Sequence, residues 1–210
     1  MSDVFDLIAR ERLRAADMLE SLDDAQLATP TLCGDWTVRD MAGHLVVPFS
    51  VGLPGLLLGM AKARGSFDVF NSRAARDLAR KPVPELVETL RRNAASHFTP
   101  PGHPPQAPLT DIAVHTRDVA RPLGLDVAAP PEVWREVLGF LVTKRAHPAF
   151  VRRGRLDGLR LRATDLEWSH GDGAEVAGPS EALALAALGR GVALGDLTGD
   201  GVEVLRSRLR

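Results

Sequence analysis

A carboxylate and an imidazole lie four residues apart near the middle of the chain, at Asp111 and His115. If this segment is helical, both side chains project from the same face, because residues four apart are neighbours on a helix. A carboxylate oxygen and a ring nitrogen at that spacing can both bind one divalent cation. Asp118 extends the same row by three residues. Asp and His at this spacing are also common on solvated helix faces that bind nothing, and the spacing by itself favours that interpretation.

His44 is the second candidate for metal chemistry, and it belongs to a different predicted helix. At 3.6 residues per turn, His44 falls about 130° from the centre of the apolar face of its helix. The row from Asp111 through His115 to Asp118 falls about 135° from the apolar centre of the other helix. We therefore expect both sets to avoid the deep core. They would face either solvent or a cleft in which a bound metal keeps an open position for substrate.

The remaining candidates carry weaker signals. Cys33 precedes a predicted helix start, which favours a thiolate, although a free cysteine is more often a buried structural residue. Arg190 follows an apolar segment and can contact an anion or simply lie on the surface. Four further histidines stand beside prolines, loops or a turn and need no chemical role: His97, His103, His147 and His170.

Helices must position these residues, and apolar periodicity predicts them over most of the first 148 residues. One helix is expected over 3–22. Another begins at Thr37, which forms a capping box with Asp40, and runs through His44 until Pro48 kinks or ends it. We also expect a loop over 65–72 and an extended, proline-rich connection over 99–108. Further helices are predicted over 73–80, 84–97, 109–123 and 132–145.

The pattern changes near residue 149 to short alternating segments. Residues 159–163 alternate between apolar and basic side chains, which predicts a strand. Gly171-Asp172-Gly173 separates two short segments and predicts a hairpin turn between them. An apolar helix is expected over 182–188. The sequence therefore predicts an α+β protein with a helical region over 1–148 and a small α/β domain over 149–210.

Composition limits the partners and the location. The 26 basic and 27 acidic residues leave a net charge of −1, which argues against nucleic-acid binding by bulk charge. The single cysteine excludes an internal disulfide and fits a reducing, cytoplasmic location. The charged N-terminal segment does not resemble a signal peptide. Residues 41–61 carry no Asp, Glu, Lys or Arg, but Pro48 and Pro54 interrupt them, so we expect no membrane helix.

The segments that hold these candidates resemble the mycothiol-dependent maleylpyruvate isomerase family. The resemblance covers nearly the whole chain, and three separated motifs in the right order are more specific than any one of them. The matching segments are Leu32-Cys33-Gly34-Asp35-Trp36-Thr37-Val38-Arg39-Asp40 with Ala42-Gly43-His44-Leu45, then Asp111-Ile112-Ala113-Val114-His115-Thr116-Arg117-Asp118, and finally residues 159–205 with Asp165, Trp168, Gly189-Arg190 and Leu197-Thr198-Gly199-Asp200-Gly201.

The resemblance implies a DinB-like four-helix bundle followed by a small sterol-carrier-like α/β domain. It implies a divalent metal, usually zinc, held by His44, Asp111 and His115. The isomerase of the family has glutamate where Asp111 stands, so the shorter side chain would draw the ion toward its helix or bind it more weakly. The family's isomerase also uses an arginine of the C-terminal domain, for which Arg190 is the match. Asp118 or Asp40 could orient a ligating histidine.

The implied chemistry depends on a low-molecular-weight thiol, mycothiol, as cosubstrate. A zinc-type ion favours the thiolate of a bound thiol, and the sulfur would add to an electrophilic carbon of a small-molecule substrate. The thiol leaves again in an isomerase and stays attached in an S-transferase. We expect such an enzyme to act as a monomer or homodimer without nucleic-acid or membrane partners. The alternatives are a non-catalytic metal- or ligand-binding bundle and a helical interaction module with solvated Asp and His rows.

Overall fold

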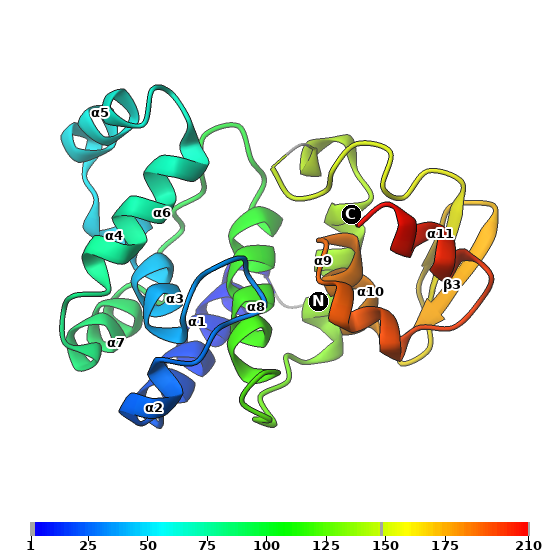
Figure 1. Ribbon diagram of the computed structural model, residues 1–210, viewed down its shortest axis with the longest axis horizontal. Coiled ribbons are helices and arrows are strands. Elements are labelled where there is room, and N and C mark those ends of the chain that lie inside the picture. Colours follow the sequence, from blue (N-terminus) through cyan, green and yellow to red (C-terminus); the bar gives the residue numbers. More distant parts are fainter. Residues whose placement is uncertain (1–2, 148, 210) are drawn as a thin grey trace. The chain divides into compact units, whose positions relative to one another are not determined.

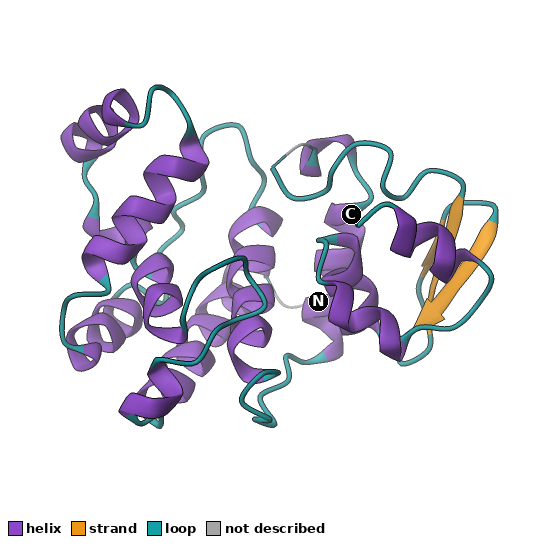
Figure 2. Ribbon diagram, viewed as in Figure 1, coloured by secondary structure: helices purple, strands orange, loops and turns teal. Residues whose placement is uncertain are grey.

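A computed structural model describes residues 3–147 and 149–209 of the chain. It is mostly helical, with a small three-stranded sheet in the C-terminal part (Figures 1 and 2). This confirms the expected α+β organisation. The chain divides into two compact units, of which the first comprises 1–98 and 115–128 and the second comprises 99–114 and 129–210. The division falls within one continuous helix, α8 (Gln106–Ala120).

The first unit is a set of helices around an aliphatic core. Helix α1 packs on α7, and α3 packs on α6. The largest side chains of this core are fully buried and include Ile8, Leu19, Met41, Leu86 and Leu90. Besides the second half of α8, the helices are α1 (Val4–Glu20), α2 (Asp24–Leu27), α3 (Val38–Leu45), α4 (Val47–Ser50), α5 (Leu53–Lys62), α6 (Phe67–Leu78) and α7 (Val83–Arg92).

Helix α3 begins as its sequence predicts. The Thr37 hydroxyl accepts a hydrogen bond from the Asp40 backbone N–H at 3.2 Å, and the Asp40 carboxylate accepts one from the Thr37 N–H at 3.0 Å. This capping box satisfies two N–H groups that the first turn leaves unpaired. The helix ends at Leu45, ahead of Pro48, so that His44 stands in its last turn.

Gly43 allows α3 and α6 to approach closely. A Cβ atom at this position would lie 2.2 Å from the backbone oxygen of Ala75 and 2.8 Å from the backbone nitrogen of Ala79. Both distances are far below van der Waals contact, so only glycine fits here. The close approach places the residue that follows, His44, against α6.

Two connections that we predicted to be irregular are partly helical. Helix α6 begins at Phe67 rather than near Arg73, because the Ser66 hydroxyl accepts from the Val69 N–H at 3.3 Å and caps the first turn. Helix α8 begins at Gln106 rather than at 109. Pro108 therefore stands in its first turn, where the missing N–H removes no helical hydrogen bond.

The uncharged stretch 41–61 is distributed over three short helices, α3, α4 and α5. Helix α5 has no buried residue, and the side chains of Leu53, Leu57 and Leu58 are exposed. Among the described residues, no helix combines the length and the apolar character needed to cross a bilayer.

The second unit packs helices beside a small sheet. Helix α10 packs on α9, and their buried leucines form the centre of the unit: Leu138, Leu141, Leu183 and Leu185. Strand β1 alternates buried and more exposed residues, as predicted for 159–163. Besides the first half of α8, the elements are α9 (Pro131–Leu141), η1 (Lys144–Ala146), β1 (Leu159–Ala163), β2 (Ser169–His170), β3 (Ala174–Gly178), α10 (Ser180–Ala187), η2 (Gly191–Asp196) and α11 (Gly201–Ser207).

The predicted hairpin around Gly171-Asp172-Gly173 was wrong. The strand order is β2-β1-β3, with β1 antiparallel to β2 and parallel to β3. Gly171 and Gly173 have positive φ, and a Cβ on either would lie 2.3 Å from a backbone oxygen, of Leu159 and of Gly158 respectively. The glycines thus let the loop pass around the start of β1, so the flanking strands pair with β1 rather than with each other.

Candidate metal centre

The imidazole rings of His44 and His115 lie against each other. Their centroids are 4.8 Å apart and their planes meet at 85°, an edge-to-face arrangement. Helix α3 supplies His44 and helix α8 supplies His115, although 70 positions of the sequence separate them. The two histidines that the sequence indicated as candidate metal ligands are therefore neighbours in the structure.

Asp111 completes a three-residue group. It lies one turn before His115 on the continuous helix α8. One carboxylate oxygen of Asp111 and one ring nitrogen from each of His44 and His115 lie within 4.8 Å of one another. Zinc lies about 2.0–2.2 Å from nitrogen and oxygen ligands, so atoms this close together are within the range of one shared ion.

A hydrogen bond orients each histidine ring. His115 Nδ1 lies 2.9 Å from Oδ2 of Asp118, and His44 Nδ1 lies 3.2 Å from Oδ1 of Asn71. Both partners offer an acceptor oxygen, so Nδ1 of each ring carries the proton and Nε2 carries the lone pair that a metal needs. The structure thus selects Asp118 from the two orienting carboxylates that we considered, because Asp40 serves the capping box.

The expectation that both sets avoid the deep core holds for Asp111 and His115, which are half-buried, and was wrong for His44 and Asp118. The side chain of His44 is 8% exposed, and Asp118 is completely buried. The angular positions of residues around a helix locate its apolar face, but they do not show which other elements cover its polar face. Here α6 covers the second side of α3, through the contact at Gly43 and through Asn71.

The loop before α3 covers the two histidines. The Trp36 ring lies 4.9 Å from the ring of His44 and 6.4 Å from that of His115, centroid to centroid. A backbone hydrogen bond of 3.1 Å from Leu32 N to Asp118 O fastens this loop to α8. The indole nitrogen of Trp36 donates to Ser72 of α6 at 3.3 Å. The loop therefore holds an aromatic surface against the candidate ligands.

Cys33 lies in the same loop and forms a second set of candidate metal ligands with His115 and Asp118. Its sulfur lies within 4.8 Å of a ligand atom of His115 and of Asp118, and the residue is half-buried. Sequence reasoning treated this cysteine as structural. The position of Cys33 before a helix start was a weak signal, and Asn71 had none, because no local pattern links positions 33 or 71 to His44 or His115.

Arg190 lies in the second unit, directly after α10 and before η2. Its Nη1 donates to the Leu188 backbone oxygen at 3.0 Å, and the residue is half-buried. Two of the histidines without an expected role have ordinary packing partners, since His97 stacks on Phe5 and His170 lies near Trp168.

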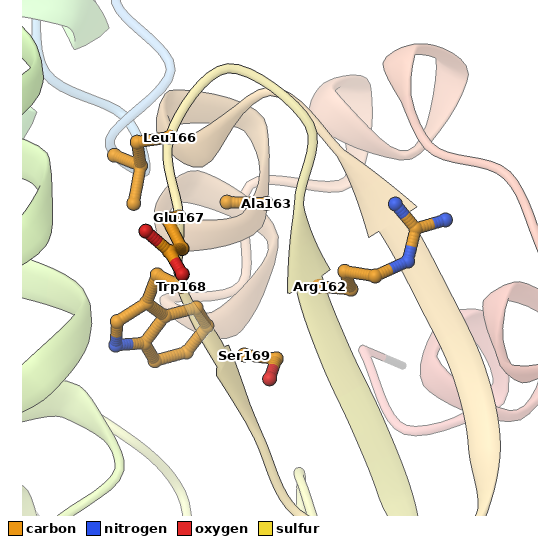
Figure 3. A pocket seen from close by; sticks show the side chains of 6 residues that line it. All are labelled: Arg162, Ala163, Leu166, Glu167, Trp168 and Ser169. Atoms are coloured by element: carbon orange, nitrogen blue, oxygen red, sulfur yellow. The ribbon is translucent and has the colours of Figure 1, made fainter.

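A pocket of about 510 Å³ lies in the second unit, at the turn between β1 and β2. Figure 3 shows Leu166, Glu167 and Trp168 along this turn, with Arg162 extending from β1 away from the indole. Arg162 forms a two-bond ion pair with Glu175 of β3, with distances of 3.0 and 3.1 Å. The pocket lining contains none of the candidate metal ligands.

The chain matches a family model and two solved structures. Residues 8–167 match the model described as mycothiol maleylpyruvate isomerase N-terminal domain. Two crystal structures, of the mycothiol-dependent maleylpyruvate isomerase and of a histidine-to-alanine variant of it, each share 17% identity with this chain. Their TM-scores are 0.58 and 0.59, and the alignments cover 95% of this chain and 96% of theirs, so they share its fold. No protein with a curated description matches the chain.

Proposed function

Because the chain belongs to the mycothiol maleylpyruvate isomerase family, we propose that it is a divalent-metal-dependent enzyme that uses mycothiol as a thiol cosubstrate. The reaction would be an isomerisation or an S-transfer on a small electrophilic substrate. The observation that carries this proposal is the convergence of His44, Asp111 and His115. Cytoplasmic location and a monomeric or homodimeric state belong to the same proposal.

The donor set fits a catalytic zinc site. Two imidazoles and one carboxylate are a typical set of three protein ligands, which leaves the fourth position for a water or substrate atom. A bound zinc ion would stabilise the thiolate, the nucleophilic form of a thiol. Asp118 and Asn71 would hold the Nδ1 protons of the ligating rings, and Trp36 would keep bulk water from them.

Arg190 would bind a carboxylate of the substrate. A guanidinium can donate two parallel hydrogen bonds to the two oxygens of a carboxylate, which fixes the orientation of the bound group. We assign Arg190 this role within a small C-terminal α/β domain over 149–210, with the metal-binding bundle over 1–148. Residue 148, at this boundary, lies outside the described residues.

A non-catalytic metal-binding protein is the second candidate, and the position of Cys33 favours it. Its sulfur lies near His115 and Asp118. A thiolate supplied by the chain itself could occupy a coordination position that a catalytic site would keep open. The two candidates therefore differ in whether a free thiol can reach the metal.

Elemental analysis of the purified protein tests the metal site. We expect near-stoichiometric metal in the wild-type protein and in the control His170→Ala, which alters an exposed histidine, and loss of metal from His115→Ala. Absence of metal from the wild-type protein would contradict both candidates.

Thiol-dependent turnover then separates the two candidates. We expect mycothiol to support conversion of maleylpyruvate or of another electrophile, and Cys33→Ser to retain this activity. Metal-loaded protein that is inactive on a broad panel of electrophiles, with a cobalt spectrum showing Cys33 bound, would establish the second candidate instead.

A further inference from the structure

The turn after α10 brings two guanidinium groups to neighbouring backbone carbonyls. Nη1 of Arg155 donates to the oxygen of Ala187 at 3.1 Å, and Nη1 of Arg190 donates to the oxygen of Leu188 at 3.0 Å. These carbonyls lie at the C-terminal end of the helix, where the helix dipole favours positive charge. Each of these bonds uses one of the five N–H donors of a guanidinium.

Gly189 and the side chain of Arg208 hold Arg155 in place. Gly189 has a φ of +93°, and a Cβ atom there would lie 3.1 Å from Nη1 of Arg155. The glycine thus lets the guanidinium pack directly against the turn that precedes Arg190. Arg208 donates to the backbone oxygens of Arg155 at 3.0 Å and Asp157 at 2.7 Å, which fastens the segment that carries Arg155.

Arg155 lacks a compensating negative charge. Its Nε atom is buried and has no hydrogen-bond partner. Within the part of the chain that the structure describes, Arg155 forms no ion pair. Burial, followed by the nearby charges of Arg152 and Arg190, lowers the pKa of its guanidinium. Helix capping explains one bond of Arg155, but it does not explain why a partly buried guanidinium without a negative partner lies near the charges of Arg152 and Arg190.

We propose that Arg155 and Arg190 together form a binding site for one carboxylate. Each guanidinium is a planar group of N–H donors suited to carboxylate oxygens, and with a carboxylate bound the buried Nε of Arg155 gains an acceptor. This inference deepens the proposed function, and it rests on that proposal for one point, namely that Arg190 binds the carboxylate of the substrate. Arg155 is then a second substrate-binding residue, and a substrate with a carboxylate binds more tightly than one without.

Calorimetric titration with succinate tests the site in the purified, full-length protein without added thiol. Succinate carries carboxylates but has no electrophilic double bond, so binding is measured apart from turnover. We expect the Kd for succinate to rise at least about tenfold in Arg155→Met and in Arg190→Met, because each loses charge-assisted hydrogen bonds. The matched control is Arg153→Met, which removes the same charge from an exposed neighbour and should leave the Kd unchanged.

Folding is followed by thermal unfolding and by metal content, which Arg155→Met should preserve. If that variant fails to fold, Arg155→Lys keeps the charge without the planar fork and should still weaken succinate binding. Equal Kd values for the Arg155 and Arg153 variants, or no succinate binding by the wild-type protein, would overturn the inference. Tighter binding of inorganic phosphate than of succinate would overturn its assignment to a carboxylate. Arg155-dependent succinate binding without any thiol-dependent turnover would instead refute the proposed function and leave the carboxylate site standing.

Discussion

Nδ1 of His115 lies 2.9 Å from Oδ2 of Asp118, a carboxylate that is completely buried one turn further along α8. A buried carboxylate is costly unless it is hydrogen-bonded or paired, so this contact stabilises the acid while it fixes the ring. The same contact engages Nδ1 of His115 and leaves Nε2 as the nitrogen that can bind a metal. Loss of this contact should therefore affect both the stability of the folded protein and the proposed metal site.

Removal of this carboxylate should weaken metal binding without removing a ligand. We expect Asp118→Ala to lower zinc affinity about 10- to 100-fold, the usual effect of losing the group that orients a ligating histidine. Asp118→Asn should lose less, because its amide oxygen can still accept from Nδ1. Competition with a chromophoric chelator measures both affinities. Unchanged affinity in Asp118→Ala would show that the contact has no part in metal binding.

Asp111 should be replaceable only by another carboxylate. Asp111→Asn removes the negative charge that a divalent ion requires from this position, and we expect metal content to fall nearly to that of His115→Ala. Asp111→Glu retains the carboxylate on a longer side chain and should keep its metal. Elemental analysis after gel filtration distinguishes the two variants. Full metal content in Asp111→Asn would exclude Asp111 as a ligand.

Gly43 should be intolerant of a side chain. In Gly43→Ala the new methyl group would collide with the backbone of α6 at Ala75, so the two helices must separate. We expect a loss of about 1–3 kcal/mol in the free energy of unfolding, the usual range for overpacking, together with weaker metal binding through displacement of His44.

The control for this variant is Gly139→Ala in α9, where a Cβ atom would meet nothing within 4 Å. Because alanine has the higher helix propensity, we expect this variant to be as stable as the wild-type protein or more stable by up to about 1 kcal/mol. Chemical denaturation measures both. A Gly43→Ala protein of wild-type stability would contradict the close packing of α3 on α6.

The ion pairs that join α1 and α7 should make stability depend on pH. Arg91 donates to Glu20 at 2.7 and 2.9 Å and to Asp17 at 2.7 Å. The hydrogen bond from Arg91 lowers the pKa of the Glu20 carboxyl below its usual value of 4.5. A carboxyl with a lowered pKa in the folded state stabilises the protein above its unfolded pKa. This contribution is lost as the pH falls through the lower, folded value.

Arg91→Met should therefore lower the urea midpoint at about pH 7, and its difference from the wild-type protein should shrink toward about pH 3. Salt should reduce the difference as well, because these side chains are exposed to solvent. Glu20→Gln tests the same pair from the other side, and its effect should not add fully to that of Arg91→Met. A difference that grows on acidification would contradict the assignment.

Local signals predicted several elements correctly. The Thr37–Asp40 capping box and the alternation over 159–163 depend on neighbouring residues alone, so the start of α3 and the whole of β1 could be predicted. The loop expected over 65–72 was wrong, because a single capping hydroxyl at Ser66 is a weak signal in the sequence. The predicted hairpin failed for a different reason, since β1 occupies the place between the two strands that flank Gly171 and Gly173.

The sequence by itself determined which side chains are able to bind a cation and which of them share a helix face. Asp111, His115 and Asp118 are related by helical spacing, which follows from 3.6 residues per turn. Only the tertiary structure decided that His44 meets this row and that Asn71 and Asp118 orient the two rings. It also decided that Arg155 packs against Gly189, in the turn that precedes Arg190. The physical reason is that these distances depend on how separate elements pack, and packing depends on contacts that no local periodicity records.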